Sequence, residues 1–381
     1  MKPIAYLVAP YHPAGGQLVN LGAARKIECV VRLLVRLGFR VRLINSGHDQ
    51  LRWQCGARRR RLIGGQRLVE IRPFTLPIRP LGKLANAAYA WLLGRRLSRR
   101  CSGSLVWLYN AYLFEGIFAL GYCRPLRLVL ELEDLPSARP RGVLDPKNRV
   151  EQLLLGRLVP MADLVSCVNH SIAARAAGAA RQVLLLPGVI MDSWLCGEQA
   201  RPFATTTLRI GYFGGLTIEK GAACLLELLP QMPDNWRLVV TGSGQLVDDF
   251  RRAGRHDQRL EFHECVSDAV LRELVWSCDV LVNPHASIHA MNDGVFPFKV
   301  YEYLSTARLV VSTALPDAGL ELGDSVVTFD GSSGSLREIL LHARQRFDER
   351  AARIQAVAAE VAIEYAESAL AQKVRDALSL S

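Results

Sequence analysis

The chain has 381 residues, half of them apolar, and a formal net charge of +11 at pH 7. This length exceeds one typical hydrophobic core, and helix-like and strand-like periods alternate throughout, so we expect a two-domain α/β protein. Nine scattered cysteines without a C-x-x-C pair argue against a disulfide framework or a zinc site. No apolar run has the length of a membrane span, and residues 4–9 predict a strand rather than a signal peptide. We therefore expect a cytoplasmic protein, either free or peripheral at the inner face of the cell membrane.

The positive charge is concentrated in the first half of the chain. Residues 1–190 are strongly basic, whereas residues 191–381 are mildly acidic, which favours two domains with different partners. Arg58–Arg61 form a compact run, and Arg95–Arg100 contain four arginines that end an amphipathic stretch. Both clusters suit an anionic membrane surface, while the alternative for the second is a solvated helix end that favours cations. We expect no nucleic-acid partner, because helix-turn-helix, RNA-recognition and OB signatures are absent from the sequence.

The first half begins like a doubly wound sheet. Residues 4–9 predict a strand, residues 20–37 a long helix and residues 40–45 a second strand. Gly15 and Gly16 stand in the loop between the first strand and the helix. They allow a backbone or a ligand to approach closely, but they do not form a G-x-G-x-x-G motif.

Three carboxylates follow a predicted strand at residues 126–131. They are Glu131, Glu133 and Asp134, at the strand end where open α/β sheets bind ligands. Carboxylates this close would perturb each other's pKa values, which is typical of a functional site. The alternative is an acidic loop that neutralises the arginines at positions 139 and 141. Further strands are predicted at residues 105–109, 162–168 and 183–188.

The strand–loop–helix pattern restarts after residues 191–207, which read as a linker. A strand at residues 208–213 leads into Gly214 and Gly215, and Lys220 precedes the next helix. The following strand ends at Gly242 and Gly244. A lysine beside a glycine loop at a strand end is typical of a phosphate contact, while the alternative is a surface lysine at a helix start.

The segment from Asp293 to Leu304 lies between two predicted buried strands, at residues 279–283 and 308–313. Lys299 to Thr306 is predicted to be a helix, with Pro297 near its first turn. Free N–H groups at its start, beside Lys299, can bind an anion, and Glu302 can accept hydrogen bonds from a sugar diol. The alternative is an ordinary amphipathic helix.

Three of these stretches, in order, resemble the nucleotide-sugar domain of GT-B glycosyltransferases. They are residues 211–221, 240–244 and 296–304, and the closest group is the retaining family 4 type, also called glycosyltransferase group 1. The resemblance implies two Rossmann-like doubly wound domains that face a central cleft, with C-terminal helices tying the domains together. The expected division is an acceptor-binding domain at 1–190, a linker at 191–207, a nucleotide-sugar domain at 208–350 and C-terminal helices at 351–381.

The resemblance also implies a reaction. A sugar would move from a nucleotide-diphosphate donor, UDP- or GDP-linked, to an acceptor of cell-surface polysaccharide or glycolipid synthesis, with retained anomeric configuration. No Asp-x-Asp is present in the sequence, so neither a metal nor another cofactor is expected, and Lys220 and Lys299 would neutralise the leaving diphosphate. The catalytic candidates are Glu133, Asp134 and Lys220. The candidates for donor binding are Gly15, Gly16, Gly214, Gly215, Lys220, Gly242, Gly244, Asp293, Gly294, Phe298, Lys299 and Glu302.

The sequence departs from the family pattern at three places. Gly215 stands where the family has an arginine, and Gly294, next to Asp293, stands where it has the first of two paired glutamates. Glu133 and Asp134 replace the family's His-Asp pair. These departures leave two alternatives open: a non-catalytic subunit that binds a nucleotide sugar or a partner enzyme, or an inverting transferase or epimerase of the same fold.

Overall fold

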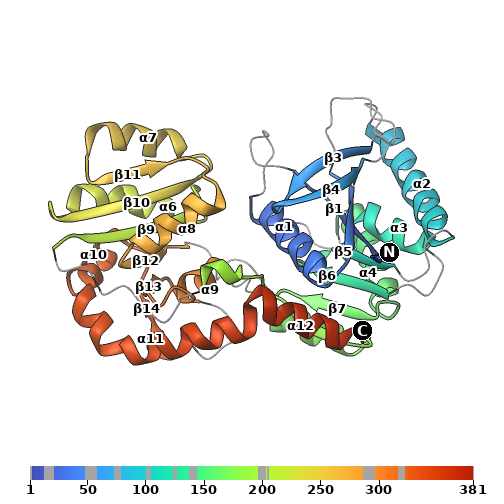
Figure 1. Cartoon of the computed structure of the whole chain (residues 1–381). Coiled ribbons are helices and arrows are strands. Elements are labelled where there is room, and N and C mark those ends of the chain that lie inside the picture. Colours follow the sequence, from blue (N-terminus) through green and yellow to red (C-terminus); the bar gives the residue numbers. More distant parts are fainter. Residues whose placement is uncertain are drawn as a thin grey trace. The chain divides into compact units, whose positions relative to one another are not determined.

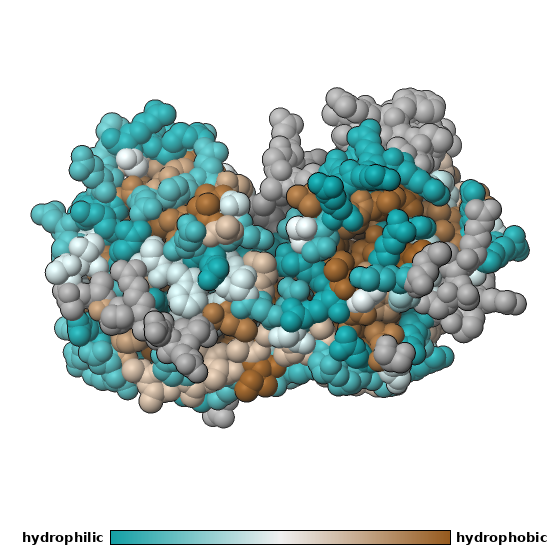
Figure 2. All heavy atoms as spheres, in the orientation of Figure 1, coloured by the Kyte–Doolittle hydropathy of each residue, from teal (hydrophilic) through white to brown (hydrophobic). Residues whose placement is uncertain are grey.

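The computed structural model describes residues 2–12, 21–47, 58–72, 79–99, 104–122, 127–136, 144–195, 203, 206–285, 297–315 and 322–380. The chain forms two compact units, one from residues 1–189 with 367–381 and one from residues 190–366 (Figure 1). On the face shown in Figure 2, hydrophilic residues cover much of the described surface of each unit, and apolar residues lie between them.

The first unit contains an eight-stranded sheet in the order β3-β4-β2-β1-β5-β6-β7-β8. Neighbouring strands are parallel, except that β3 is antiparallel to β4. The strands are β1 Ile4–Ala9, β2 Arg40–Asn45, β3 Arg58–Ile63, β4 Gln66–Ile71, β5 Leu105–Tyr109, β6 Arg127–Leu132, β7 Leu164–Cys167 and β8 Val183–Leu185. The helices of this unit are α1 Leu21–Arg36, α2 Arg79–Ser98, α3 Leu113–Gly121, α4 Pro146–Leu158, α5 His170–Ala177 and α12 Glu367–Ala377.

Successive residues of the strands point to opposite faces of this sheet, and each face has its own apolar core. Leu7 and Leu43 pack with residues of α1 and α12, while Tyr6 and Ile44 pack with residues of α2 and α3. The C-terminal helix α12 belongs to the first unit because Leu370 and Val374 are buried in its core and Glu367 pairs with Arg32 of α1.

The second unit contains a six-stranded parallel sheet in the order β11-β10-β9-β12-β13-β14. Its strands are β9 Leu208–Gly215, β10 Trp236–Ser243, β11 Leu260–His263, β12 Val280–Asn283, β13 Leu309–Ser312 and β14 Val326–Thr328. Its helices are α6 Ala222–Leu228, α7 Val247–His256, α8 Asp268–Ser277, α9 Lys299–Leu304, α10 Ser333–Leu341 and α11 Ala343–Tyr365. Short 3-10 helices lie at Asp192–Trp194, Leu229–Gln231 and Gly323–Ser325.

The strand order of the second sheet defines where a ligand site is expected. The chain runs outward from β9 through β10 to β11, and then returns to place β12 on the other side of β9. The direction of winding therefore reverses between β9 and β12. In open parallel sheets, ligands bind outside the carboxyl ends of the strands at this switch point.

The predicted fold class is confirmed: the chain is an α/β protein with two Rossmann-like units built on parallel sheets and with C-terminal helices. Several elements were not predicted, among them the hairpin of β3 and β4 and the short strand β14. The arginine run at residues 58–61 is part of the edge strand β3.

Candidate functional site

The loops that follow β9, β10 and β12 pack against one another at the switch point. Gly221 has a φ of +71°, and an ideal Cβ there would lie 1.6 Å from the carbonyl oxygen of Pro284, directly after β12. At Gly242, with a φ of +156°, an ideal Cβ would lie 1.8 Å from the carbonyl oxygen of Gly214. Only glycine fits at either position, since a side chain would overlap the neighbouring backbone. Glycine thus brings the carboxyl ends of three strands together.

Basic side chains from three elements meet beside these loops. Lys220, in the loop after β9, has its Nζ 2.9 Å from Nε2 of His285, which follows β12. Lys299, the first residue of α9, places its Nζ 4.4 Å from the centroid of the Tyr212 ring on β9. The same Nζ is 3.7 Å from the position that a Cβ of Gly214 would occupy. We call Lys220, His285 and Lys299 the basic cluster.

The basic cluster is electrostatically unfavourable in the free protein. Burial lowers the pKa of Lys299 to about 7, and the charge of Lys220 lowers it further, while Glu302 acts in the opposite direction. Burial also lowers the pKa of Lys220, against a raising effect of Glu219. Neither lysine forms an ion pair with a carboxylate in the part of the chain that the structure describes. The cluster therefore lacks a neutralising partner among these residues.

His285 is neutral in this environment. Burial, followed by the charges of Lys220 and Lys299, lowers its pKa to about 4. A lysine ammonium group only donates hydrogen bonds, so Nε2 of His285 accepts from Lys220 and its proton lies on Nδ1. The side chain is 5% exposed, and Nδ1 is buried with no hydrogen-bond partner among the described residues. His285 therefore positions Lys220 through Nε2, and its Nδ1–H, on the other side of the ring, is a buried donor that no described residue satisfies.

An anion with two or more negative charges would satisfy this arrangement. Two ammonium groups would supply charge-assisted hydrogen bonds, and burial strengthens each of them. The position at the carboxyl edge of a parallel sheet is where nucleotide phosphates bind in doubly wound folds. The chemistry of the site is therefore that of a diphosphate site.

Residues 207–357 match the family model described as "Glycosyl transferases group 1". This region is a glycosyltransferase group 1 domain. It includes the whole basic cluster and the strands β9 to β14 that position it. The resemblance predicted from the glycine and lysine motifs is thereby confirmed for this part of the chain.

Solved structures show that the whole chain has the GT-B fold. Anabaena HepE, in complex with UDP and glucose, aligns with a TM-score of 0.67 and 16% identity over 99% of each chain. WaaG, described as a glycosyltransferase involved in lipopolysaccharide biosynthesis, aligns with a TM-score of 0.64 and 15% identity over 99% of this chain and 100% of its own. An E. coli structure described as trehalose-6-phosphate bound with UDP-2-fluoro glucose aligns with a TM-score of 0.62 and 13% identity over 99% of each chain. No curated protein sequence matches the chain.

The remaining candidates for donor binding lie at the ends of β9 and β10, at the start of α9 or outside the described residues. Gly244 follows β10, next to Ser243, whose carbonyl oxygen accepts a hydrogen bond from the amide of Leu216 in the loop after β9. Gly215 accepts a hydrogen bond at its carbonyl oxygen from the Tyr212 hydroxyl, at 2.6 Å. Gly15, Gly16, Asp293 and Gly294 lie outside the described residues.

The helix α9 carries two further candidates. Glu302 is half-buried and lies three residues after Lys299 on the first turn. Phe298 precedes the helix, and its ring packs at 5.9 Å from the Tyr301 ring and at 6.4 Å from the Tyr365 ring. The Phe298 side chain is therefore part of an aromatic cluster, and only its backbone remains as a ligand contact.

The acidic loop of the first unit has a partner that the sequence interpretation did not include. Glu133 and Glu131 lie 2.9 Å and 3.3 Å from Nζ of Lys26, a buried residue of α1. Trp107 donates to Glu131 at 2.8 Å, and burial raises the pKa of Glu131 to about 7, although Lys26 lowers it. Asn110 accepts hydrogen bonds from the amides of Glu133 and Asp134. The carboxylates thus neutralise a lysine of α1, while the arginines at 139 and 141 lie outside the described residues.

Sequence reasoning missed His285 and Tyr212. His285 stands directly after Pro284, which ends a predicted strand, so its position at the carboxyl edge of the sheet was a usable signal. Tyr212 lies within a buried strand and gave no signal, because an aromatic residue there reads as core. The described residues contain no group of three or more side chains that could hold a metal ion.

Proposed function

We propose that the protein is a retaining glycosyltransferase that transfers a sugar from a nucleotide-diphosphate donor to an acceptor of cell-surface polysaccharide or glycolipid synthesis. The observation that carries the proposal is the basic cluster. It holds Lys220, His285 and Lys299 together at the switch point of a group 1 domain without a described counter-charge. A donor diphosphate would supply the missing charge.

In this proposal Lys220 and Lys299 bind the diphosphate. Departure of the nucleotide diphosphate builds negative charge on its oxygens, and cations that are fixed beforehand stabilise that charge where it develops. The anion stabilises the charged form of Lys299 most, because it returns the pKa of this lysine from about 7 toward its ordinary value of 10.5. The two lysines would do this without a metal ion.

The other candidate residues surround that diphosphate in the proposal. Glu302 accepts hydrogen bonds from the ribose hydroxyls, and Gly242 and Gly244 line the base pocket. Gly214, Gly215 and the backbone of Phe298 approach the phosphates. A UDP-linked donor is favoured because the HepE and E. coli structures contain UDP or a UDP-sugar. In the first unit, Glu133 and Asp134 would face the transferred sugar and the acceptor hydroxyl.

We assign contact with an anionic membrane to the exposed face of α2. Leu84 and Leu92 are 69% and 58% exposed there, and the Arg95 guanidinium carbon lies 5.1 Å from the centroid of the exposed Trp91 ring. Apolar side chains with a tryptophan, followed by arginines, suit the interface of an anionic bilayer. None of the helices in the described part of the chain is long and apolar enough to cross a membrane. A lipid-linked acceptor at the inner face of the cell membrane would fit this surface.

Binding and turnover together test the proposal. Calorimetric titration with UDP and GDP should show binding of one nucleotide, and the Lys220→Ala variant should lose it. Turnover is then measured as release of that nucleoside diphosphate from a panel of sugars linked to it, and the anomeric configuration of the product is identified by NMR. Absence of binding to any nucleoside diphosphate would overturn the proposal. Binding without turnover on any acceptor would favour the non-catalytic alternative, for which Gly215 in place of the family's arginine is the supporting feature.

A further inference from the structure

The arginine run of the first unit is divided between two faces of a β-hairpin. Strand β3 pairs with β4 so that Arg58 lies opposite Ile71 and Arg60 lies opposite Val69. On the other side of β4, Val69 lies opposite Arg42 of β2. Residues that face each other across strands share a side of the sheet, so Arg42, Arg58 and Arg60 share one face and Arg59 and Arg61 the other.

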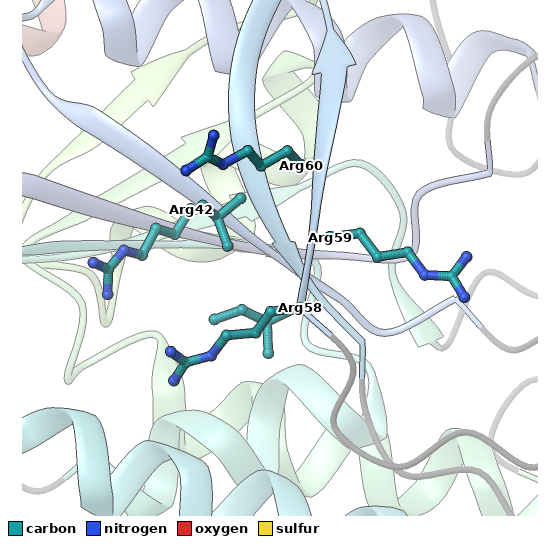
Figure 3. Close-up of a pocket in the computed structure, with 6 residues that line it drawn as sticks. Arg42, Arg58, Arg59 and Arg60 are labelled. Atoms are coloured by element: carbon teal, nitrogen blue, oxygen red, sulfur yellow. The ribbon is translucent and has the colours of Figure 1, made fainter.

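Figure 3 shows this division directly. The guanidinium groups of Arg42, Arg58 and Arg60 point to one side of the strands, and that of Arg59 points to the opposite side. Together with Val69 and Ile71, these three arginines border a pocket of about 260 Å³, which Arg59 also lines although its guanidinium group points away from the other three. We call Arg42, Arg58 and Arg60 the arginine face.

On the opposite face, Arg61 has a structural role. Nε of Arg61 lies 2.8 Å from an oxygen of Glu70, whose side chain is fully buried. Asn45 and Arg72 also contact this carboxylate, at 2.7 Å and 3.2 Å. Arg61 therefore neutralises a buried charge of the fold.

The arginine face has no such partner. Among the described residues, no carboxylate forms an ion pair with Arg42, Arg58 or Arg60. Arg42 contacts Tyr6, with a nitrogen 3.4 Å from the hydroxyl and its guanidinium carbon 5.9 Å from the ring centroid, and its buried Nε has no hydrogen-bond partner in the described part of the chain. Arg58 and Arg60 are two residues apart on one strand, which separates them by about 7 Å. Of the four arginines that line this pocket, three thus carry their charges on the same side of the strands.

We propose that the arginine face binds a phosphate group with two or more negative charges, a diphosphate or a phosphomonoester. Guanidinium groups bind phosphate oxygens in pairs, and three of them bordering one pocket can contact two sides of such a group. Val69 and Ile71 supply the apolar part of the pocket lining. The group belongs either to a lipid headgroup or to a soluble molecule. The arginine face belongs to the first unit, whereas the basic cluster belongs to the second.

Titration with inorganic pyrophosphate tests the site, with Arg58→Gln and Arg60→Gln as the variants and Arg59→Gln as the matched control. All three remove one charge from the same strand, but only Arg59 points to the other face. We expect Arg58→Gln and Arg60→Gln to weaken pyrophosphate binding about tenfold or more, and Arg59→Gln to change it less than about twofold. Pyrophosphate also suits the basic cluster, so each titration is repeated in proteins that additionally carry Lys220→Ala and Lys299→Ala. We expect binding by the arginine face to persist in these proteins.

Vesicles identify the source of the phosphate group. Sedimentation with phosphatidylcholine vesicles that contain phosphatidic acid is compared among the same variants, and any contact made by α2 is common to all of them. Weaker vesicle binding by Arg58→Gln and Arg60→Gln, but not by Arg59→Gln, supports a lipid phosphate. The same pattern for pyrophosphate alone supports a soluble ligand. The proposal is overturned if Arg59→Gln weakens binding as much as the other two, or if wild-type protein binds neither probe.

Discussion

The substitution Lys299→Met tests whether Lys299 serves ligand binding or the stability of the fold. Methionine has a similar length and carries no charge, so Lys299→Met removes the repulsion within the basic cluster. The free protein should therefore become more stable, while binding of UDP should weaken. Opposite effects on stability and binding are typical of strained functional sites and not of structural ion pairs.

The size of the effect follows from the pKa of Lys299. The difference between 10.5 and about 7 is worth roughly 5 kcal/mol at 1.36 kcal/mol per unit of pKa, as an upper limit. The side chain is partly exposed although its ammonium group lies among protein atoms, so solvent screening reduces the gain to about 1–3 kcal/mol. The unfolded chain binds more protons than the folded one between pH 7 and 10.5, so the penalty is full below pH 7 and disappears above pH 10.5. The advantage of Lys299→Met should shrink over that range.

Thermal unfolding and calorimetry measure the two effects. We expect the unfolding temperature of Lys299→Met to rise by about 2–4 °C for each kcal/mol gained. UDP affinity should fall about 10–100-fold, because one charge-assisted hydrogen bond is lost. Lys2→Met is the control, since Lys2 is exposed and should change neither quantity. A variant that is less stable than wild type, or that binds UDP as tightly, would refute the reasoning.

Three further predictions concern the same loops. UDP affinity of the wild type should decrease by up to about tenfold per unit of pH above pH 7, because Lys299 must then take up a proton on binding. Calorimetry in buffers of different ionisation enthalpy measures this proton uptake, which should be absent in Lys299→Met. His285→Ala should weaken UDP binding about 3–10-fold, and His285→Gln less, because glutamine keeps an acceptor for Lys220; equal losses in titrations of both variants would contradict this role. Gly221→Ala should destabilise the second unit by more than about 2 kcal/mol, since its Cβ would overlap the carbonyl oxygen of Pro284 in the loop after β12. The control Gly38→Ala, with a φ of +89° and open space around it, should cost about 1 kcal/mol. Similar unfolding temperatures for the two variants would show that the loops move apart easily.

Much of the fold was predictable because parallel sheets bury both faces of their strands. Residues 105–109 are apolar or aromatic throughout, and all five are buried in β5. Such runs, with helical periods between them, specify a doubly wound sheet from local information alone. The glycine loops added the positions where strands end and ligands approach.

Strand β3 was not predictable in this way. Arg58 to Arg61 show no alternation of apolar and polar residues, and arginine gives no preference for a strand. The strand forms because β4 offers a pairing edge and Glu70 offers a buried counter-charge to Arg61. Both partners lie in the adjoining strand of the same hairpin, and the Gly64-Gly65 pair between the strands, with φ values of +56° and +75°, was a local turn signal that sequence reasoning missed.

The candidate site was predictable in position but not in its contacts. Lys220 and Lys299 were expected at one sheet edge, and the structure adds His285 as the residue that contacts Lys220. The pairing of Glu133 with Lys26 was hidden, since the two residues are more than a hundred positions apart and become neighbours only when α1 packs on the sheet. The functional roles of all these residues stay predictions until binding is measured.

The treatment of buried charge across the chain supports a ligand role for the unneutralised groups. Lys26 is paired with two carboxylates, and Arg61 is paired with Glu70. A buried charge that supports the fold is paired with a group of opposite charge, because an unpaired buried charge costs several kcal/mol. The basic cluster breaks this rule, although the chain carries 36 acidic residues that selection could have placed beside it. The arginine face is different, because Arg58 and Arg60 are exposed and an unpaired charge at the surface costs little. Local rules are broken mainly where function requires it, so the basic cluster is best explained as a site that an anionic ligand completes.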